Sequence, residues 1–212
     1  MRLSRRVPVA VCVLFLAGEA CGDTRVEIDF IPMTPAHAPA ARAYEAIWKE
    51  FGERIVAALE ARTCLPFSET RLAAIVDDAP SHSGGPHYPM RLRAGYSREV
   101  KQSTLVHELG HRHLWQLVER LDGVDGHRTL YLILDRVWAD VWGEEFARQR
   151  IATESSWKAD YDYASAWAWA ETLPGAEKER LWRRLLEMNG FDGCSLSPVL
   201  LRTGVTAATN DP

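Results

Sequence analysis

The chain lacks an excess of positive charge, and after its first twenty residues it lacks any hydrophobic run long enough to cross a membrane. Its 212 residues carry 25 lysines and arginines against 29 acidic residues, which gives a net charge of −4. Because phosphate binding depends on clustered lysine and arginine, this balance argues against a nucleic-acid partner. The 47% of hydrophobic residues excludes a disordered or collagen-like chain. Length and composition therefore predict a globular protein of one domain.

Residues 1–20 have the layout of a secretory signal peptide. Three arginines precede an uncharged, mostly apolar run at 7–18, and Ala20 and Cys21 follow. The run is too short to span a bilayer as a mature helix, and the small residues before Cys21 suit cleavage there. We therefore predict export to the cell envelope, the periplasm or the extracellular space. Cys21 is then either a free N-terminus or the attachment point of a lipid anchor, which would be the only membrane contact.

The chain has only four cysteines, so any set of disulfides is small. Cys12 and Cys21 fall in or beside the signal, which leaves Cys64 and Cys194 in the folded part. In an oxidising compartment these two thiols either form a disulfide or are buried separately. The sequence leaves both possibilities open, because it does not give the distance between the two Cα atoms.

The first half of the chain shows strand and helix patterns in turn. Hydrophobic residues recur with period two at 25–31 and with helical spacing at 39–61. Residues 71–76 predict a second strand, and 90–96 predict a third. The arginines of this third strand share one face, which suits the edge of a sheet.

The second half of the chain has helical patterns throughout. Ser97 is a suitable N-cap for a long helix at 97–121, and another helix is predicted at 128–152. Two shorter helices are expected at 161–171 and 175–188. This order predicts an α+β fold, in which a small three-stranded sheet packs on a mainly helical body. The expected parts of the chain are a signal peptide at 1–20, a single domain at 21–202 and a disordered tail at 203–212.

The strongest chemical signal is an H-E-x-x-H motif formed by His107, Glu108 and His111 within the helix predicted at 97–121. Residues four apart in a helix are related by about 400° and about 6 Å, so both imidazoles point the same way and can share one metal ion. Zn²⁺ held in this way brings the pKa of its water toward about 7, and Glu108 can take the proton. The motif therefore predicts a zinc site with Glu108 as general base.

From 71 to 150 the chain resembles the zincin superfamily of metallopeptidases, with a compact gluzincin-like core. The resemblance rests on the H-E-x-x-H motif in a helix that follows an edge strand, where zincins hold an extended substrate beside the metal. It implies that His107 and His111 are zinc ligands and that Glu108 is the general base. The metzincin branch is disfavoured, because that pattern requires a glycine and a third histidine where this chain has Leu114 and Leu117.

A third zinc ligand must come from outside the motif, and the helix predicted at 128–152 supplies carboxylates. In one continuous helix, Asp140 and Glu144 share the apolar stripe that should face the active-site helix. A carboxylate on a buried stripe needs a metal or a hydrogen-bond partner. One of these two residues is therefore the expected third ligand, and the alternative is that both form ion pairs with Arg136 or Arg148 on the helix surface.

The segment from Asp140 to Ala147 also resembles a pattern in peptidases of mobile elements that cleave immunity repressors. That resemblance implies Asp140 as the third ligand and Glu144 as the residue that orients a ligand histidine. The chain departs from gluzincins because it has the shorter aspartate where they carry glutamate, so the two roles are open to exchange. If neither residue binds zinc, the ligand must be sought at His127 or at a later carboxylate such as Glu154.

Other polar and aromatic residues are weaker candidates. His113 lies on a different side of its helix from His111, which favours a structural role. Tyr161 or Tyr163 could stabilise a tetrahedral oxyanion, although an aromatic-rich helix also explains them. Three tryptophans favour core packing over sugar binding. They are Trp157, Trp167 and Trp169.

Two functions of different classes follow from these residues. The first is an exported zinc-dependent metallopeptidase that hydrolyses peptide bonds in a peptide or protein substrate. The second is a non-catalytic zincin-like envelope protein that binds zinc or a protein partner. The presence of Glu108 favours the first, because a zinc-binding protein without catalysis has no need of a carboxylate beside its two ligands.

Overall fold

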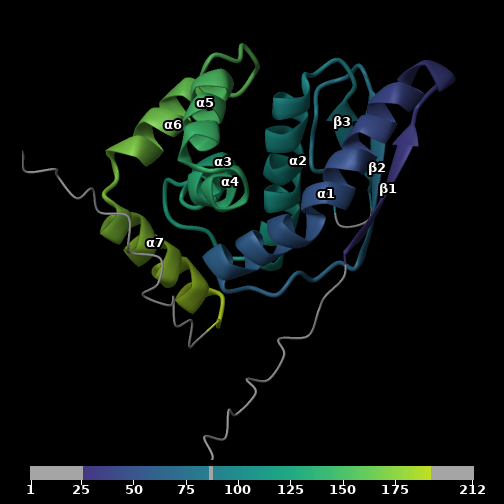
Figure 1. The fold of residues 1–212 in the computed structure, drawn as a ribbon. Coiled ribbons are helices and arrows are strands. Elements are labelled where there is room, and N and C mark those ends of the chain that lie inside the picture. The colour runs from purple at the N-terminus through teal and green to yellow at the C-terminus, as the bar shows by residue number, and fades with distance from the viewer. Residues whose placement is uncertain (1–25, 86–87, 192–212) are drawn as a thin grey trace, which may run out of the picture.

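The computed structural model describes residues 26–85 and 88–191, and over these it has the predicted α+β architecture. A small sheet lies on one side, α2 runs through the centre and most of the other helices lie beyond it (Figure 1). The strands are β1 (Glu27–Pro32), β2 (Arg71–Asp77) and β3 (Met90–Arg93). The longer helices are α1 (Ala38–Thr63), α2 (Arg98–His113), α4 (Leu134–Trp142), α5 (Glu144–Ser155), α6 (Tyr163–Thr172) and α7 (Gly175–Met188). The short ones are η1 (Pro35–His37), η2 (Leu114–Gln116) and α3 (Gly126–Tyr131).

The sheet has the order β1-β2-β3, and all three strands are parallel. Parallel neighbours need a crossover between them, and α1 makes the one between β1 and β2. Alternate residues of β2 are buried, among them Leu72, Ala74 and Val76. Since α1 packs on β1 and α2 packs on β3, this face of the sheet meets the two longest helices and places the H-E-x-x-H motif beside the core.

Helix α1 forms over the residues that its hydrophobic spacing predicts. Tyr44, Ile47, Ile55 and Leu59 lie on one face of it and are fully buried. The helix ends at Cys64, whose backbone is left-handed with a φ of 58°. Cys64 is disulfide-bonded. The other cysteines of the chain, including the Cys194 considered above, lie outside the described residues.

The predicted third strand is shorter than expected, and its outer edge is closed at one point. Strand β3 ends at Arg93, but it does lie at the edge of the sheet. The amide of Arg91 donates to the carbonyl of His82 at 2.9 Å, and the amide of His82 donates to the carbonyl of Arg91 at 3.0 Å. Because the chain itself pairs with Arg91, an extended substrate cannot add to the sheet at this residue.

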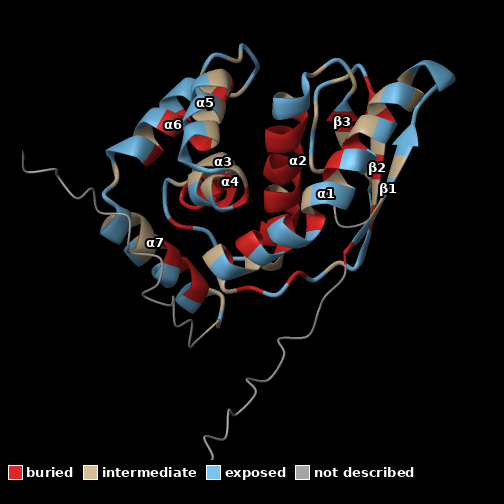
Figure 2. Cartoon of the chain, viewed as in Figure 1, coloured by how far each residue is buried: buried red, intermediate tan, exposed pale blue. Residues whose placement is uncertain are grey.

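Helix α2 is the central element of the domain. Ser97 caps it as predicted, with its side chain accepting from the amide of Val100. The helix ends at His113 and passes into η2, so it is shorter than the predicted 97–121. It is buried along most of its length (Figure 2), including the polar side chains of His107 and Glu108. Polar groups buried on a helix are costly unless they have partners or a function.

The single helix predicted at 128–152 is wrong, because the structure has three helices there. Helix α3 ends at Tyr131, α4 begins at Leu134, and α5 begins at Glu144. The break between α4 and α5 is at Gly143, which has a φ of 94°. An α-helix cannot continue through that conformation, and glycine adopts it with little strain. Residues before and after Gly143 therefore do not share one helical stripe.

The last two predicted helices are confirmed as α6 and α7. None of the described helices is long and apolar enough to cross a membrane. The predicted signal peptide, the cleavage or lipidation point at Cys21 and the predicted tail at 203–212 lie outside the described residues.

Candidate metal centre

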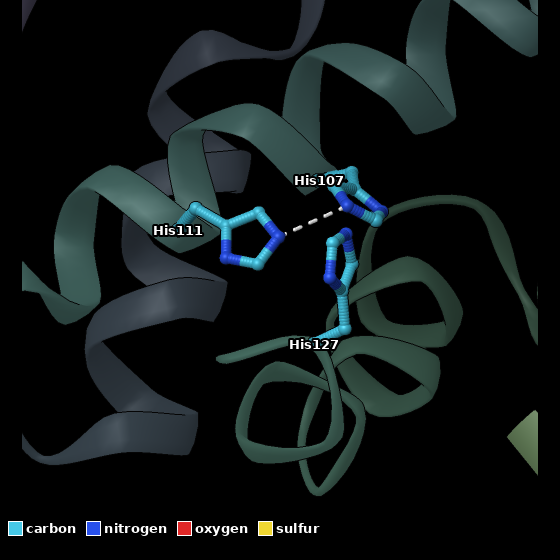
Figure 3. A group of neighbouring side chains, drawn as sticks. All are labelled: His107, His111 and His127. Atoms are coloured by element: carbon cyan, nitrogen blue, oxygen red, sulfur yellow. Dashed lines mark hydrogen bonds between the residues drawn. The ribbon is translucent and has the colours of Figure 1, made fainter. Parts of the chain in front are cut away.

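The two histidines of the motif point toward each other from consecutive turns of α2. Their Nε2 atoms are 3.1 Å apart (Figure 3). His107 is buried and His111 is partly buried. The spacing of the motif therefore produces the convergence of imidazole nitrogens that the sequence predicts.

His127, at the start of α3, completes the group. One ring nitrogen from each of His107, His111 and His127 lies within 4.8 Å of the others. All three rings face a common point in Figure 3. Among the described residues, this is the one group of three or more such side chains with the geometry to hold a metal ion.

A close approach of two helices brings His127 to the motif. A Cβ atom added to Gly110 of α2 would lie 2.6 Å from Cδ1 of Leu130 in α3, which is closer than side chains pack. Gly110 therefore lets the short helix α3 lie directly against α2. The start of α3 is fixed by Asp125, whose side chain accepts from the amide of Arg128. His127 thus projects from a capped helix end toward the other two histidines.

The structure does not bring the two predicted third ligands to this group, and their assignment is corrected. The carboxylate oxygens of Asp140 accept from Arg62 of α1, each at 2.6 Å. Glu144 is exposed and accepts from Arg136 at 2.9 Å. The physical reason is the break at Gly143, because the shared stripe required an unbroken helix. The alternative of a surface ion pair with Arg136 is confirmed for Glu144.

Glu154, near the end of α5, lies behind His107 and not among the ligand atoms. Its side chain is fully buried and accepts three hydrogen bonds. His107 Nδ1 lies 3.0 Å from one carboxylate oxygen, and the other accepts from the hydroxyl of Tyr131 at 3.1 Å and from Nε1 of Trp167 at 3.0 Å. A carboxylate at Nδ1 holds the proton there, which leaves Nε2 of His107 as a free lone pair that faces His111.

The charges around the histidines favour two neutral rings. Burial, with the neighbouring rings of His107 and His127, holds the pKa of His111 well below its usual value. Burial and His107 also lower the pKa of His127 to about 4, although Asp125 opposes the shift. For His107, burial lowers the pKa, but the contact with Glu154 outweighs it and raises the pKa overall. His111 and His127 therefore keep their lone pairs at neutral pH, as metal ligands must.

Glu108 follows His107 in α2 and is also buried, at 7% exposure. Burial raises the pKa of Glu108 to about 7, with His107 lowering it and Glu154 raising it. The carboxylate accepts no hydrogen bond from the described residues. A buried carboxylate without a donor and with a pKa near neutrality can both accept and return a proton.

The donor set fits a zinc ion. With Zn–N bonds of about 2.0–2.1 Å, two nitrogens of a tetrahedral site lie about 3.3 Å apart. The 3.1 Å between the Nε2 atoms of His107 and His111 is close to this separation. Three imidazoles with a carboxylate behind one of them are also the donors that zinc takes in sites with an open fourth position.

The weaker candidates have mixed outcomes. His113 is buried away from the group, where Nε2 is 2.8 Å from the hydroxyl of Thr63 and the ring stacks on Phe67. Its structural role is confirmed. Tyr161 stacks on His127 with ring centroids 4.0 Å apart, and Tyr163 meets the same ring edge-on at 5.2 Å. Both tyrosines therefore lie beside the candidate metal centre.

The sequence carried few signals for the rest of the site. Nothing in the spacing connects His127 or Glu154 to the motif, because both reach it through tertiary packing. The one available signal was the chemistry of the two side chains, a histidine close to a helix start and a glutamate close to a helix end. Comparison with protein families, curated proteins and solved structures found no match to this chain.

Proposed function

We propose that this protein is a zinc-dependent peptidase, with His107, His111 and His127 as the metal ligands and Glu108 as the general base. The observation that carries the proposal is the convergence of three imidazole nitrogens within 4.8 Å beside a buried glutamate. A metal site without catalysis would need the histidines alone. The buried Glu108 costs free energy in the fold and accepts no hydrogen bond from the described residues to offset that cost, which favours a chemical role.

The residues of the site have separate tasks in peptide hydrolysis. When bound, zinc acts as a Lewis acid that polarises a carbonyl and acidifies water. Glu108 accepts the proton of the attacking water and returns it to the leaving amine. Glu154 keeps His107 in the tautomer whose Nε2 faces the other ligands, because it occupies Nδ1 at 3.0 Å. Tyr131 and Trp167 hold Glu154 in place.

Export of the protein is part of the same proposal. It rests on the signal-like layout of residues 1–20, which precede the described part of the chain. The disulfide bond at Cys64 is typical of proteins that work in an oxidising compartment. Mass spectrometry of the secreted product should give a mature chain that begins at Cys21. A product that retains the N-terminal arginines would contradict the export prediction.

The purified chain is expected to contain one zinc per molecule and to cleave peptides in a chelator-sensitive manner. Three ligands are needed to hold the ion against water, and the group offers three. Elemental analysis after dialysis against buffer with trace zinc measures the metal. A digest of a peptide library with and without chelator measures the activity. Protein that remains free of zinc would contradict the metal site, and zinc-loaded protein that cleaves no peptide would contradict the reaction.

Glu154→Gln is expected to weaken zinc binding by about 10- to 100-fold, which is the usual cost of removing a carboxylate behind a ligand histidine. The amide retains the size of the side chain but loses the charge that holds the proton on Nδ1 of His107. Competition with a chromogenic chelator measures the affinity. The matched control is Glu144→Gln, because Glu144 is exposed and its carboxylate pairs with Arg136, away from the three histidines. Equal affinities in the two variants would remove Glu154 from the site.

A further inference from the structure

A continuous row of rings leads from the candidate metal centre toward β3. The rings of Tyr161 and Tyr163 meet edge-on at 5.1 Å between centroids, and Tyr163 meets Trp157 edge-on at 5.5 Å. Trp157 then lies parallel to Tyr96, with an interplanar angle of 6° and centroids 6.0 Å apart. His127 begins the row through its stack on Tyr161. The row thus runs from the candidate ligand His127 to the loop between β3 and α2.

Tyr96 and Trp157 come from two separate parts of the fold. Tyr96 lies between β3 and α2, and Trp157 follows α5. Both side chains are partly exposed, unlike Trp167, which is fully buried. The expectation that Trp157 packs in the core is therefore wrong in part, because the Trp157 ring is partly exposed and stacks on Tyr96. Partly exposed aromatic side chains next to a reactive centre are groups that a ligand can contact.

The loop that carries Tyr96 is held by buried side chains. Lys101 donates to the carbonyls of Ala94, at 2.6 Å, and of Tyr96. The hydroxyl of Tyr44 donates to the carbonyl of Arg93 at 3.0 Å. These bonds fix the loop, since each of these carbonyls has a partner in the core. Tyr96 is therefore held in position before any substrate binds, which lowers the entropic cost of using it as a contact.

The charge of Arg93 beside Tyr96 disfavours a cationic side chain at this surface. The guanidinium of Arg93 lies over the Tyr96 ring at 5.7 Å from its centroid, so a second cation would meet a like charge. A neutral aromatic side chain avoids this repulsion and can pack against the rings of Tyr96 and Trp157.

We infer that Tyr96 and Trp157 form the subsite for an aromatic side chain next to the scissile bond of the substrate. The inference rests on the proposed peptidase function and adds the class of substrate. Aromatic pairs contribute more than the area they bury, so phenylalanine, tyrosine or tryptophan is preferred over leucine at this position. The preference is expressed mainly in KM, because the contact is made before the reaction as well as during it.

Cleavage of a peptide library tests the subsite. The wild-type protein is expected to cleave next to aromatic residues, on one fixed side of the bond. A phenylalanine peptide should exceed its leucine counterpart by about 3- to 10-fold in kcat/KM. Tyr96→Ala and Trp157→Ala should reduce this ratio to near one while retaining one zinc per chain, and Trp157→Phe should restore most of it. Cleavage without aromatic preference, or a ratio unchanged in both alanine variants, would overturn the subsite.

Trp115→Ala is the matched control, since Trp115 is also partly exposed and lies in η2, beyond the far end of α2. It should leave the ratio unchanged. If Trp115→Ala lowers the ratio as much as Trp157→Ala does, the loss reflects general destabilisation, and the inference is overturned.

A binding measurement separates the subsite from the reaction. Zinc-loaded Glu108→Gln protein is titrated with an acetylated alanine tetrapeptide amide that carries one phenylalanine, and with the same peptide carrying leucine. Tighter binding of the phenylalanine peptide, lost when Trp157→Ala is added, supports the subsite. A wild-type protein that cleaves no peptide would contradict only the proposed function. Equal binding of the two peptides overturns the subsite, whatever the activity.

Discussion

Replacing His127 by alanine is expected to abolish stoichiometric zinc binding, whereas Asp140→Ala is expected to retain one zinc per chain. His127 supplies one of three converging ring nitrogens, and the two that remain cannot hold the ion against water. Asp140 instead forms an ion pair with Arg62, in which its side chain is 34% exposed. Its loss should cost stability by no more than about 1 kcal/mol. Elemental analysis and thermal unfolding of the two variants measure both effects.

The zinc contents of His127→Ala and Asp140→Ala show whether a histidine or a carboxylate is the third ligand. His111→Ala serves as the positive control for loss of metal, because His111 lies within the motif itself. Circular dichroism of each variant without zinc shows whether the fold is retained, so loss of metal is not confused with unfolding. Zinc retained in His127→Ala and lost in Asp140→Ala would return the site to the carboxylate arrangement that the sequence predicted.

The sequence predicted the convergence of the two motif histidines correctly but not the third member of the group, because only the first prediction depends on the geometry of one helix. His107, Glu108 and His111 occupy one helix, so their relation depends only on helical periodicity, and the structure brings the two imidazoles together as expected. The choice of Asp140 or Glu144 depended on periodicity across Gly143. One residue with a φ of 94° removes that relation.

The placement of His127 could not be derived from the sequence for a different reason. Its approach depends on the absence of a side chain at Gly110, a position that the motif leaves free, and on the packing of Leu130 against it. Neither fact has a local signature. Similarly, the hydrophobic pattern of β3 predicts an edge strand, but the pairing of His82 with Arg91 arises from a loop whose path the pattern does not determine.

Most elements followed from hydrophobic spacing alone, because burial on one face decides them. The helix over 175–188 and the strand over 71–76 agree with α7 and β2 to within one residue. The predicted ends of helices and strands are wrong where a glycine or a loop interrupts the hydrophobic pattern. The long helix predicted at 97–121 ends at His113, and the strand predicted at 90–96 ends at Arg93. The loop after Arg93 carries Tyr96, so the early end of the strand also places one of the two rings of the inferred subsite.

Glu108→Gln is expected to retain one zinc per chain and to lose peptide hydrolysis by about 10²- to 10⁴-fold, the usual contribution of a general base. The amide has nearly the same shape as the carboxylate but cannot accept the proton of the attacking water. Because Glu108 has no hydrogen-bond donor among the described residues, the substitution breaks no contact that the fold requires. It also replaces a buried group that ionises with one that does not, so stability should not fall.

The control for this substitution is Glu99→Gln in the first turn of the same helix. Glu99 is exposed and accepts from the hydroxyl of Ser97 at 2.9 Å, away from the candidate metal centre, so its variant should cleave at the parental rate. The assay is kcat/KM on a peptide taken from the library digest, with zinc content measured on the same samples. A Glu108→Gln protein that is as active as Glu99→Gln would assign the base to another residue. A Glu108→Gln protein that lacks zinc would show that this carboxylate supports the metal itself.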